Sequence, residues 1–301
     1  MISPPHGDPA AGEAFLGVER SLTGRRWQLR PGDERMAQAL SQRMGLPEII
    51  GRVLASRGID IDLAESFLNP TLRDLLPDPS HLLDMTQAVE RLVHAIRQNE
   101  PIAIFGDYDV DGATSSALLA RFLTAVGASP RVYIPDRVTE GYGPNAPALL
   151  RLKAEGVGVV VTVDCGVTAF EALAAAAEAG LDVVVVDHHA AEAALPRACA
   201  VINPNRLDET SPHRQLAAVG VAFLLVVALN RALRIGGWYG TAGKGPDPMQ
   251  WLDIVALGTV CDVVPLVGLN RALVTQGLKV LAKRANAGLA ALADVGGVRE
   301  R

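Results

Sequence analysis

The chain has few cysteines and no long apolar run, and each of these features excludes a class of protein. Its 301 residues include three cysteines, Cys165, Cys199 and Cys261, which are odd in number and distant from one another in the sequence. This pattern argues against a disulfide framework and against a cysteine-rich zinc site. No apolar run reaches the roughly 18 uninterrupted residues that a membrane-spanning helix needs. We therefore expect no membrane segment.

An excess of basic residues is missing as well. The chain carries 28 Lys and Arg against 33 Asp and Glu, a formal net charge of −5. Composition therefore predicts no overall positive field that would attract nucleic acid, although a local basic groove is compatible with a negative total. The first ten residues have neither a basic start nor an apolar core, so they do not resemble a secretory signal. These features favour a cytoplasmic protein.

Hydrophobic residues make up 49% of the chain, enough for the core of one large α/β domain or of two smaller ones. Residues 1–25 are rich in Pro, Gly and small side chains, so we expect a flexible N-terminus. Apolar residues at helical spacing predict helices over 36–58 and 62–68, and a proline-rich run ends this pattern near residue 80. The sequence thus predicts a helical N-terminal region at 26–80 and a larger domain at 81–301.

Strand-like and helix-like segments alternate through the larger domain. The strand-like runs are apolar throughout, which is typical of parallel strands buried on both faces. We therefore predict an α/β fold with a doubly wound, mainly parallel sheet flanked by helices. The expected strands are 102–105, 131–134, 158–163, 181–186 and 200–202. The expected helices are 82–98, 113–126, 146–155, 169–179, 251–260 and one within 213–233.

Three aspartates at alternate positions follow the first of these strands. Asp107, Asp109 and Asp111 form a turn between the strand and an apolar helix, where carboxylates can hold a hard divalent cation. The same letters begin a calcium-binding loop, but its twelfth position is Leu118 rather than the required Glu. A solvated acidic turn is the other alternative. The recurrence of the pattern further along the chain favours the metal site.

Acidic or imidazole groups also follow two later strands. Asp164 comes directly after the strand 158–163, and Asp187–His189 follow the strand 181–186. Because parallel strands deliver their carboxyl ends to one edge of a sheet, these groups should converge. Asp262 lies alone among apolar residues, where a carboxylate without a partner is costly. A helix N-cap is its structural alternative, and we favour a metal ligand.

The resulting cluster is rich in oxygen and contains one imidazole, which suits Mn²⁺ or Mg²⁺ better than structural zinc. Asp164 could bridge two ions about 3.5–4 Å apart, so one or two ions are expected. The chemistry that this arrangement predicts is hydrolysis of a phosphoester or phosphoanhydride. The predicted metal ligands are Asp109, Asp111, Asp164, His188 and Asp262.

Four motifs in this order resemble those of the DHH phosphoesterase superfamily. They are Gly106-Asp-Tyr-Asp-Val-Asp-Gly112, Val163-Asp-Cys-Gly166, Asp187-His-His189 and Gly258-Thr-Val-Cys-Asp-Val-Val-Pro265. The N-terminal helical region and the polar loop 137–145 resemble, within that superfamily, the bacterial single-strand-specific 5′ to 3′ DNA exonucleases. The resemblance implies the same five metal ligands. It also implies that Asp107 and His189 contact the first metal, its water or the scissile phosphate, and that Asp187 orients an imidazole.

The resemblance further implies a substrate and partners. Arg137 and Asn145 would contact phosphate, and Tyr142 would provide a stacking platform for a base of single-stranded DNA. A single-strand-binding protein and a helicase are the suggested partners, in DNA repair and recombination, with no membrane involved. The family also has a second, DHHA1-like domain with a Gly-Gly-His motif and an OB-fold. Here no His follows Gly296-Gly297, so we expect a chain that keeps the metal site but binds DNA weakly.

Two other functions are compatible with the same residues. A small-molecule phosphohydrolase of this superfamily would act on pyrophosphate, short oligonucleotides or a cyclic dinucleotide. A degenerate scaffold or truncated inactive fragment would have lost ligands, whereas all five are present.

Overall fold

A computed structural model of the chain describes residues 14–28, 32–241 and 243–298. The chain divides into two compact units, Met1–Asn69 and Pro70–Arg301. The predicted boundary near residue 80 falls inside the second unit, because Leu72 and Leu76 already pack against its hydrophobic core. Much of the segment predicted to be flexible, residues 1–13, lies outside the described residues.

The first unit is helical around a small apolar core. The helical spacing predicts a single helix over 36–58, but the structure has two. Gly45 ends the first with a φ of 62°, a left-handed conformation that favours glycine, and Pro47 precedes the second. The elements are η1 (Phe15–Gly17), α1 (Glu34–Met44), α2 (Glu48–Ser56) and α3 (Ile61–Leu68). The buried core residues are Leu40, Leu54, Ile59 and Ala64.

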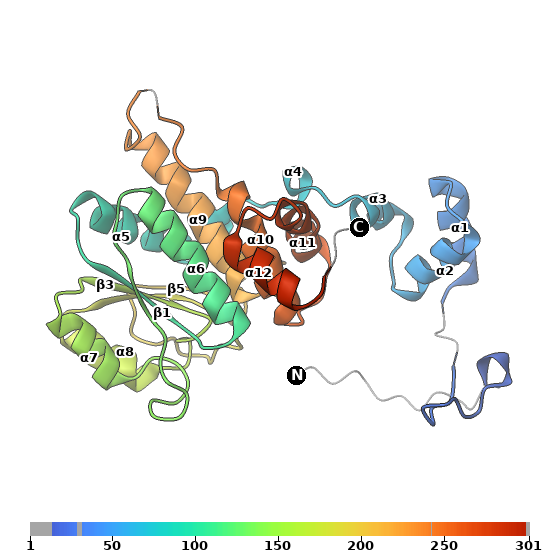
Figure 1. Ribbon diagram of the computed structural model, residues 1–301, viewed down its shortest axis with the longest axis horizontal. Helices are drawn as coiled ribbons and strands as arrows, with labels where there is room; N and C mark the ends of the chain where they lie inside the picture. The colour runs from blue at the N-terminus through green and yellow to red at the C-terminus, as the bar shows by residue number, and fades with distance from the viewer. Residues whose placement is uncertain (1–13, 29–31, 242, 299–301) are drawn as a thin grey trace. The chain divides into compact units, whose positions relative to one another are not determined.

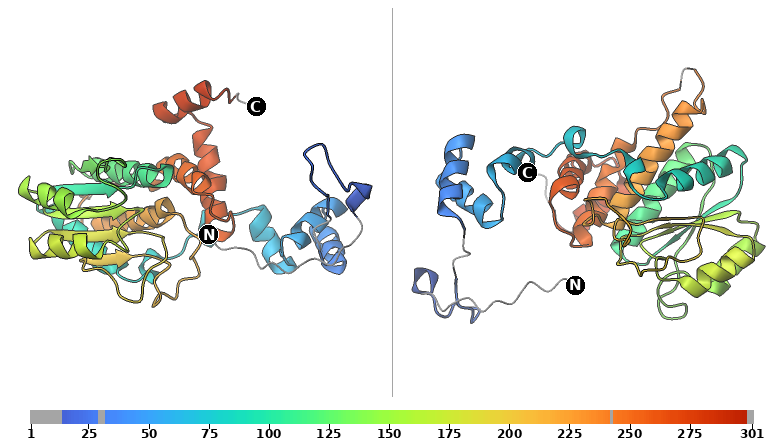
Figure 2. Two further views of the ribbon diagram at one scale, coloured as in Figure 1. Left: turned by 90° about the horizontal axis from the view of Figure 1, so that it is seen from below. Right: turned by 180° about the vertical axis from the view of Figure 1, so that it is seen from behind.

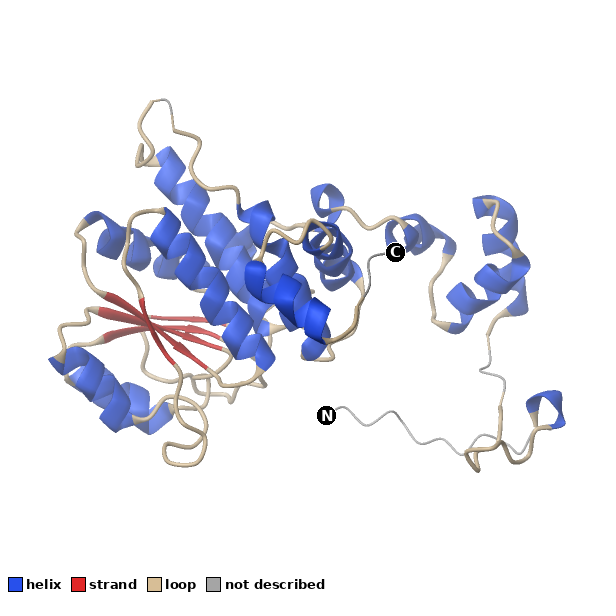
Figure 3. Cartoon of the chain, in the orientation of Figure 1, coloured by secondary structure: helices blue, strands red, loops and turns tan. Residues whose placement is uncertain are grey.

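Within the described residues of the second unit, five strands form one sheet (Figure 3). The strands lie in the order β2-β1-β3-β4-β5, and every neighbouring pair is parallel. The predicted parallel α/β sheet is therefore confirmed. The strands are β1 (Ile102–Gly106), β2 (Arg131–Tyr133), β3 (Val159–Val163), β4 (Asp182–Val186) and β5 (Ala200–Ile202).

Alternate residues of the central strands enter two separate cores, one on each face of the sheet. In β3, Val159, Val161 and Val163 belong to one core, and Val160 belongs to the other. Helices cover both faces, as Figure 1 and the view from behind in Figure 2 show. One face packs against α5 (Met85–Arg97), α6 (Val110–Ala125) and α9 (Ala218–Ile235). In the same core, α10 (Leu252–Cys261) packs on α6 and α9, and α11 (Gly268–Leu281) packs on α10. The other face packs against α7 (Ala146–Ala154) and α8 (Phe170–Glu178).

Helix α9 is the apolar centre of the first core. Among the residues that the structure describes, it is the one helix long and apolar enough to span a membrane, with a window of 18 residues. Of that window, 72% is buried inside the protein, so α9 serves here as a core helix. The remaining elements are α4 (Leu72–Leu75), η2 (Pro79–His81), η3 (Pro248–Trp251) and α12 (Ala287–Val295).

The strand order places a topological switch point between β1 and β3. From β1 the chain moves outward to β2, and then crosses back to β3 on the other side of β1. Ligands of open α/β sheets bind outside the carboxyl ends of the strands at such a point. The acidic turn after β1 and Asp164 after β3 therefore stand where a doubly wound sheet places its functional groups.

Substitution of Gly277 tests the close packing of α10 on α11. A Cβ at Gly277 would overlap the main-chain carbonyl of Leu252 and lie 2.5 Å from the Cβ of Ala256. Overpacking costs about 1–3 kcal/mol, which should exceed the gain of about 1 kcal/mol in helix propensity. We therefore expect Gly277→Ala to lower the free energy of unfolding in urea. The control is Gly288→Ala, whose Cβ would meet its nearest atom at 3.6 Å. Equal stabilisation of both variants would contradict this packing.

Candidate metal centre

The register of the sheet brings the three strand-end motifs to one level. Gly106 pairs with Val163, and Val163 pairs with Val186. The residues that follow these three are Asp107, Asp164 and Asp187, and the main-chain hydrogen bonding continues through each of them. The predicted convergence of these motifs is therefore built into the pairing of β1, β3 and β4.

Asp109 and Asp111 lie at the start of α6, in different surroundings. Asp109 is exposed and caps the helix, accepting a hydrogen bond from the N–H of Gly112 at 2.9 Å. Asp111 is buried, and its two oxygens accept the N–H groups of Ala218 and Val219 at 2.6 and 2.9 Å. Burial raises the pKa of Asp111 to about 6. Asp111 thus joins the acidic turn to the N-terminus of α9, where the helix dipole favours a carboxylate.

Asp164 turns the chain sharply at the end of β3. Its φ of 61° is left-handed, a conformation that Asp adopts more readily than most other residues. The side chain is buried, and burial raises the pKa of the carboxyl well above its usual range. Its Oδ1 lies 3.2 Å from Nε2 of His188, outside hydrogen-bond geometry.

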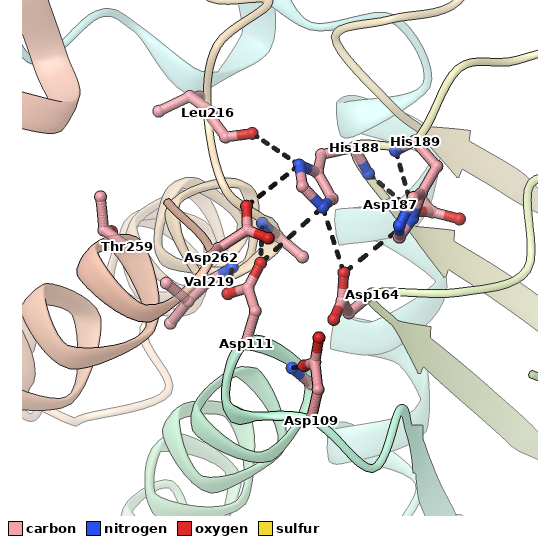
Figure 4. Close-up of polar contacts among 12 residues, drawn as sticks. Asp109, Asp111, Asp164, Asp187, His188, His189, Leu216, Val219, Thr259 and Asp262 are labelled. Atoms are coloured by element: carbon pink, nitrogen blue, oxygen red, sulfur yellow. Dashed lines mark hydrogen bonds and ion pairs between the residues drawn. The ribbon is translucent and has the colours of Figure 1, made fainter. Parts of the chain in front are cut away.

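His188 is held between a carbonyl and several carboxylates (Figure 4). Its Nδ1 lies 3.0 Å from the carbonyl oxygen of Leu216, which can only accept, so Nδ1 carries a proton. Nε2 then faces Oδ1 of Asp164 and, at 3.9 Å, Oδ2 of Asp111. A neutral imidazole would direct a lone pair at these oxygens. Burial lowers the pKa of His188, but Asp164, Asp262 and Asp111 outweigh burial and raise the pKa overall.

Asp262 lies at the wrong end of a helix to be an N-cap. It follows the last residue of α10, and its N–H donates to the carbonyl of Gly258. Its Oδ2 is buried, has no hydrogen-bond partner among the described residues, and lies 3.7 Å from Nδ1 of His188. A helix C-terminus carries negative partial charge, so a carboxylate there is unfavourable without a nearby cation. The N-cap alternative is therefore wrong, and the geometry favours a ligand.

Asp187 differs from the other aspartates because its oxygens bond within the protein. Oδ1 accepts the N–H groups of His188 and His189 and lies 2.7 Å from Nδ1 of His189, while Oδ2 accepts the N–H of Val167. Burial raises the pKa of Asp187, but the bonds with His189 and Val167 outweigh burial and lower the pKa overall. Asp187 therefore orients His189, whose side chain is half exposed.

The ligand atoms fall into three overlapping groups, within each of which all lie less than 4.8 Å apart. The groups are Asp164, His188 and His189; Asp111, His188 and Asp262; and Asp107, Asp109 and Asp164. Asp164 and His188 each belong to two groups, an arrangement that could hold neighbouring ions.

Within the described part of the chain, four buried atoms of this cluster have no hydrogen-bond partner, and unpaired buried polar atoms call for an explanation. The unpartnered atoms are Oδ1 of Asp107, Oδ1 of Asp164, Nε2 of His188 and Oδ2 of Asp262. This oxygen-rich donor set fits a hard divalent cation.

The loop between β2 and α7 carries the three predicted substrate residues. The hydroxyl of Tyr142 donates to the carbonyl of Asp164 at 3.1 Å, which places its ring beside the cluster. The guanidinium of Arg137 lies 5.0 Å from the ring centroid of Tyr108. Asn145 is the N-cap of α7, as predicted, so its Oδ1 is already used, and its Nδ2 is buried without a hydrogen-bond partner among the described residues.

Tyr108 and Leu216 are two contributors that the sequence reasoning missed. The ring of Tyr108 lies edge-on to that of Tyr142, with centroids 6.4 Å apart. Its position between two aspartates of the first motif could have identified Tyr108. Leu216 contributes only its main-chain carbonyl, and no side-chain pattern signals such a role.

A parallel α/β sheet whose strand ends gather aspartates and a histidine pair presents oxygen and imidazole ligands that could hold divalent cations. The profile described as "DHH family, N-terminal domain" matches residues 101–259, just over half of the chain. The chain belongs to this family.

Curated relatives and solved structures agree with that assignment. The chain is 36% identical to the single-stranded-DNA-specific exonuclease RecJ of Bacillus subtilis (strain 168), over 90% of this chain and 33% of the relative. It is 42% identical to RecJ of Dickeya dadantii (strain 3937), over 83% of this chain and 43% of the relative. The structure of RecJ in complex with Mn²⁺ from Thermus thermophilus matches with a TM-score of 0.70 and 31% identity, covering 89% of this chain and 36% of the other. The chain thus spans about a third to two fifths of the length of these relatives.

Replacing Asp164 tests the cation site directly. A ligand present at about 100 times its Kd stabilises a protein by about 2.7 kcal/mol, so Mn²⁺ should raise the Tm of the wild type over that in EDTA. Asn also adopts left-handed φ values, so Asp164→Asn removes the charge without straining the turn. We expect Asp164→Asn to lose most of the Mn²⁺-induced rise in a thermal-shift assay. Asp208→Asn, which removes an exposed carboxylate paired with Arg206, should retain it. An undiminished rise in Asp164→Asn would rule out this ligand.

Proposed function

We propose that this chain forms the metal-binding catalytic part of a single-stranded-DNA exonuclease of the RecJ type. The observation that carries the proposal is the cluster of buried ligand atoms, unpartnered among the described residues, at the ends of β1, β3, β4 and α10. The similarity to single-stranded-DNA-specific exonucleases over most of the chain supports the choice of substrate. The proposed reaction is hydrolysis of a phosphodiester bond, from the 5′ end, as the family resemblance implies.

The cofactor would be Mn²⁺ or Mg²⁺, in one or two copies. RecJ structures have been solved with each of these ions, and the donor set here consists of carboxylates and imidazole. When bound, such ions neutralise charge on the phosphate and lower the pKa of water. The proposed ligands are Asp109, Asp111, Asp164, His188 and Asp262.

The remaining polar groups of the site act on the substrate in this proposal. The hydrogen bond between Asp187 and Nδ1 of His189 leaves Nε2 of the half-exposed ring free to contact the scissile phosphate or move a proton at its oxygen. Asp107, whose buried Oδ1 is unpartnered in the described structure, faces Asp109 and Asp164 and completes the acidic side of the centre.

Single-strand selectivity would come from stacking near the metal centre. Tyr142 is 52% exposed, and unpaired bases can stack on an aromatic ring, whereas bases in a duplex are already stacked. A groove of about 550 Å³ begins at Tyr108 and Asp109 and continues along α6 between α10 and α12. Arg137 would contact a phosphate beside Tyr108, whereas Asn145, whose Oδ1 caps α7 and whose Nδ2 is buried, would support the loop rather than touch the substrate. The groove offers room for an unpaired nucleotide next to the cation.

The cellular setting of the proposal follows the resemblance. We propose action in the cytoplasm, in DNA repair and recombination, with a single-strand-binding protein and a helicase as partners. The alternative function is a small-molecule phosphohydrolase of the DHH family, for which the net charge of −5 leaves room. An inactive scaffold is disfavoured because the candidate ligands converge in the structure.

Hydrolysis of labelled DNA distinguishes these functions. With Mn²⁺, the wild type should release mononucleotides from 5′-labelled single strands and leave duplex DNA intact. Asp262→Asn should reduce release to background because the charge at the end of α10 is lost, and Asp208→Asn should remain active. Hydrolysis of pyrophosphate or dinucleotides without DNA cleavage would support the small-molecule alternative instead.

Arg137→Ala tests the proposed phosphate contact. Losing one charge-assisted hydrogen bond of about 1.5 kcal/mol should raise KM for single-stranded DNA about tenfold with little change in kcat. The salt dependence of binding should become shallower by about one unit of slope. Arg197→Ala removes an exposed arginine that is paired with Glu178, and serves as the charge-matched control. An equal effect of both substitutions would refute a specific contact at Arg137.

A further inference from the structure

Two segments far apart in the sequence complete the metal centre around the strand ends. The first, residues 215–219, precedes and begins α9; it contains the Leu216 carbonyl near His188 and the two N–H groups that hold Asp111. The second, residues 262–267, is the α10–α11 loop and carries Asp262. The distances among His188, Asp111 and Asp262 therefore depend on how these two segments are held together.

One side chain bridges the two segments. Asn270, near the start of α11, is 0% exposed. Its Nδ2 donates to the carbonyl of Gln215 at 2.6 Å and to that of Pro265 at 3.1 Å. Both carbonyls can only accept, so the NH₂ group must face them, and both of its hydrogens are used. No other atom of the amide could replace these bonds.

Each bonded carbonyl lies close in sequence to a group of the metal centre. Gln215 immediately precedes Leu216, whose carbonyl meets Nδ1 of His188. Pro265 lies three residues after Asp262, across Val263, which has a φ of 61°. A left-handed β-branched residue is strained, and it persists only where the surroundings fix the backbone. The bond from Asn270 to Pro265 fixes the end of that strained segment.

We propose that Asn270 is a positioning residue that sets the separation of His188 and Asp111 from Asp262 in the metal centre. The inference rests on the proposed function, because it assumes that these residues bind a divalent cation. Within the described part of the chain, the side-chain hydrogen bonds of Asn270 go to the carbonyls of Gln215 and Pro265 and not to a candidate ligand. Groups that hold ligands in place commonly affect metal affinity by about 10- to 100-fold.

Asn230 provides a matched control within the same unit. It lies in α9, is 4% exposed, and donates from Nδ2 to the carbonyl of Pro246 at 2.9 Å. Its Oδ1 accepts the hydroxyl of Tyr239 at 2.8 Å. Asn230 therefore resembles Asn270 in residue type, burial and bonding to a loop carbonyl, but none of its hydrogen bonds leads to a candidate ligand.

The experiment compares Asn270→Ala, Asn270→Ser and Asn230→Ala with the wild-type chain. Stability is measured by urea unfolding in EDTA, and Mn²⁺ affinity by isothermal titration calorimetry on metal-free protein. Both alanine variants should lose stability, but only Asn270→Ala should weaken Mn²⁺ binding, by about 10- to 100-fold. Asn270→Ser should fall between Asn270→Ala and the wild type, because a hydroxyl can still donate to one of the two carbonyls.

Each contrary result has a distinct meaning. Unchanged Mn²⁺ affinity in Asn270→Ala, or equal weakening in Asn230→Ala, would overturn the positioning role while leaving the metal centre intact. Failure of both Asn270 variants to fold, with Asn230→Ala folded, would show that Asn270 supports the fold as a whole, which also overturns the positioning role. Absence of Mn²⁺ binding by the wild type would overturn the metal centre itself.

Discussion

Negative charge gathered at the ends of three parallel strands is the constraint on which the rest of this structure depends. The register of β1, β3 and β4 makes the convergence unavoidable, because Gly106, Val163 and Val186 pair in line. Buried carboxylates without partners are costly, so they either take up protons, as the raised pKa of Asp164 indicates, or share the site with something positive. Without a metal ion, a proton on His188 can take part of that role, as the raised pKa of the ring indicates. A divalent cation bound by His188 would displace this proton from the ring.

Two carboxylates of the cluster lie at helix ends of opposite partial charge. Asp111 sits at the N-terminus of α9 and receives two N–H groups, which offset part of the cost of burying its charge. Asp262 sits at the C-terminus of α10, where the partial charge is negative and no N–H group of the described residues reaches its buried Oδ2. Of the two, Asp262 therefore depends more on an added positive charge. The side of the site at Asp111 is therefore fixed by hydrogen bonds within the protein, whereas the side at Asp262 has no such bond to Oδ2 among the described residues.

The sequence predicts the sheet and the ligand set because both rest on patterns of side chains. Continuous apolar strands and acids at their ends identify β1, β3 and β4 and the groups they carry. The pair Gly45 and Pro47 was a visible signal for the break between α1 and α2 that the helical spacing conceals. What the sequence could not predict is the main-chain framework of the site. The carbonyl of Leu216 and the N–H groups at the start of α9 belong to every residue type, so no pattern marks them.

That framework also explains how strained backbone survives beside the ligands. Asp164 and Val263 both adopt φ values of 61°, and Val has no side-chain group that could offset the cost. At each place a hydrogen bond to a nearby carbonyl holds the chain: the hydroxyl of Tyr142 binds the carbonyl of Asp164, and Asn270 binds that of Pro265. Strain that is fixed by packed neighbours directs ligands more narrowly than a relaxed loop would. The precision of the centre therefore resides in residues that do not bind the cation.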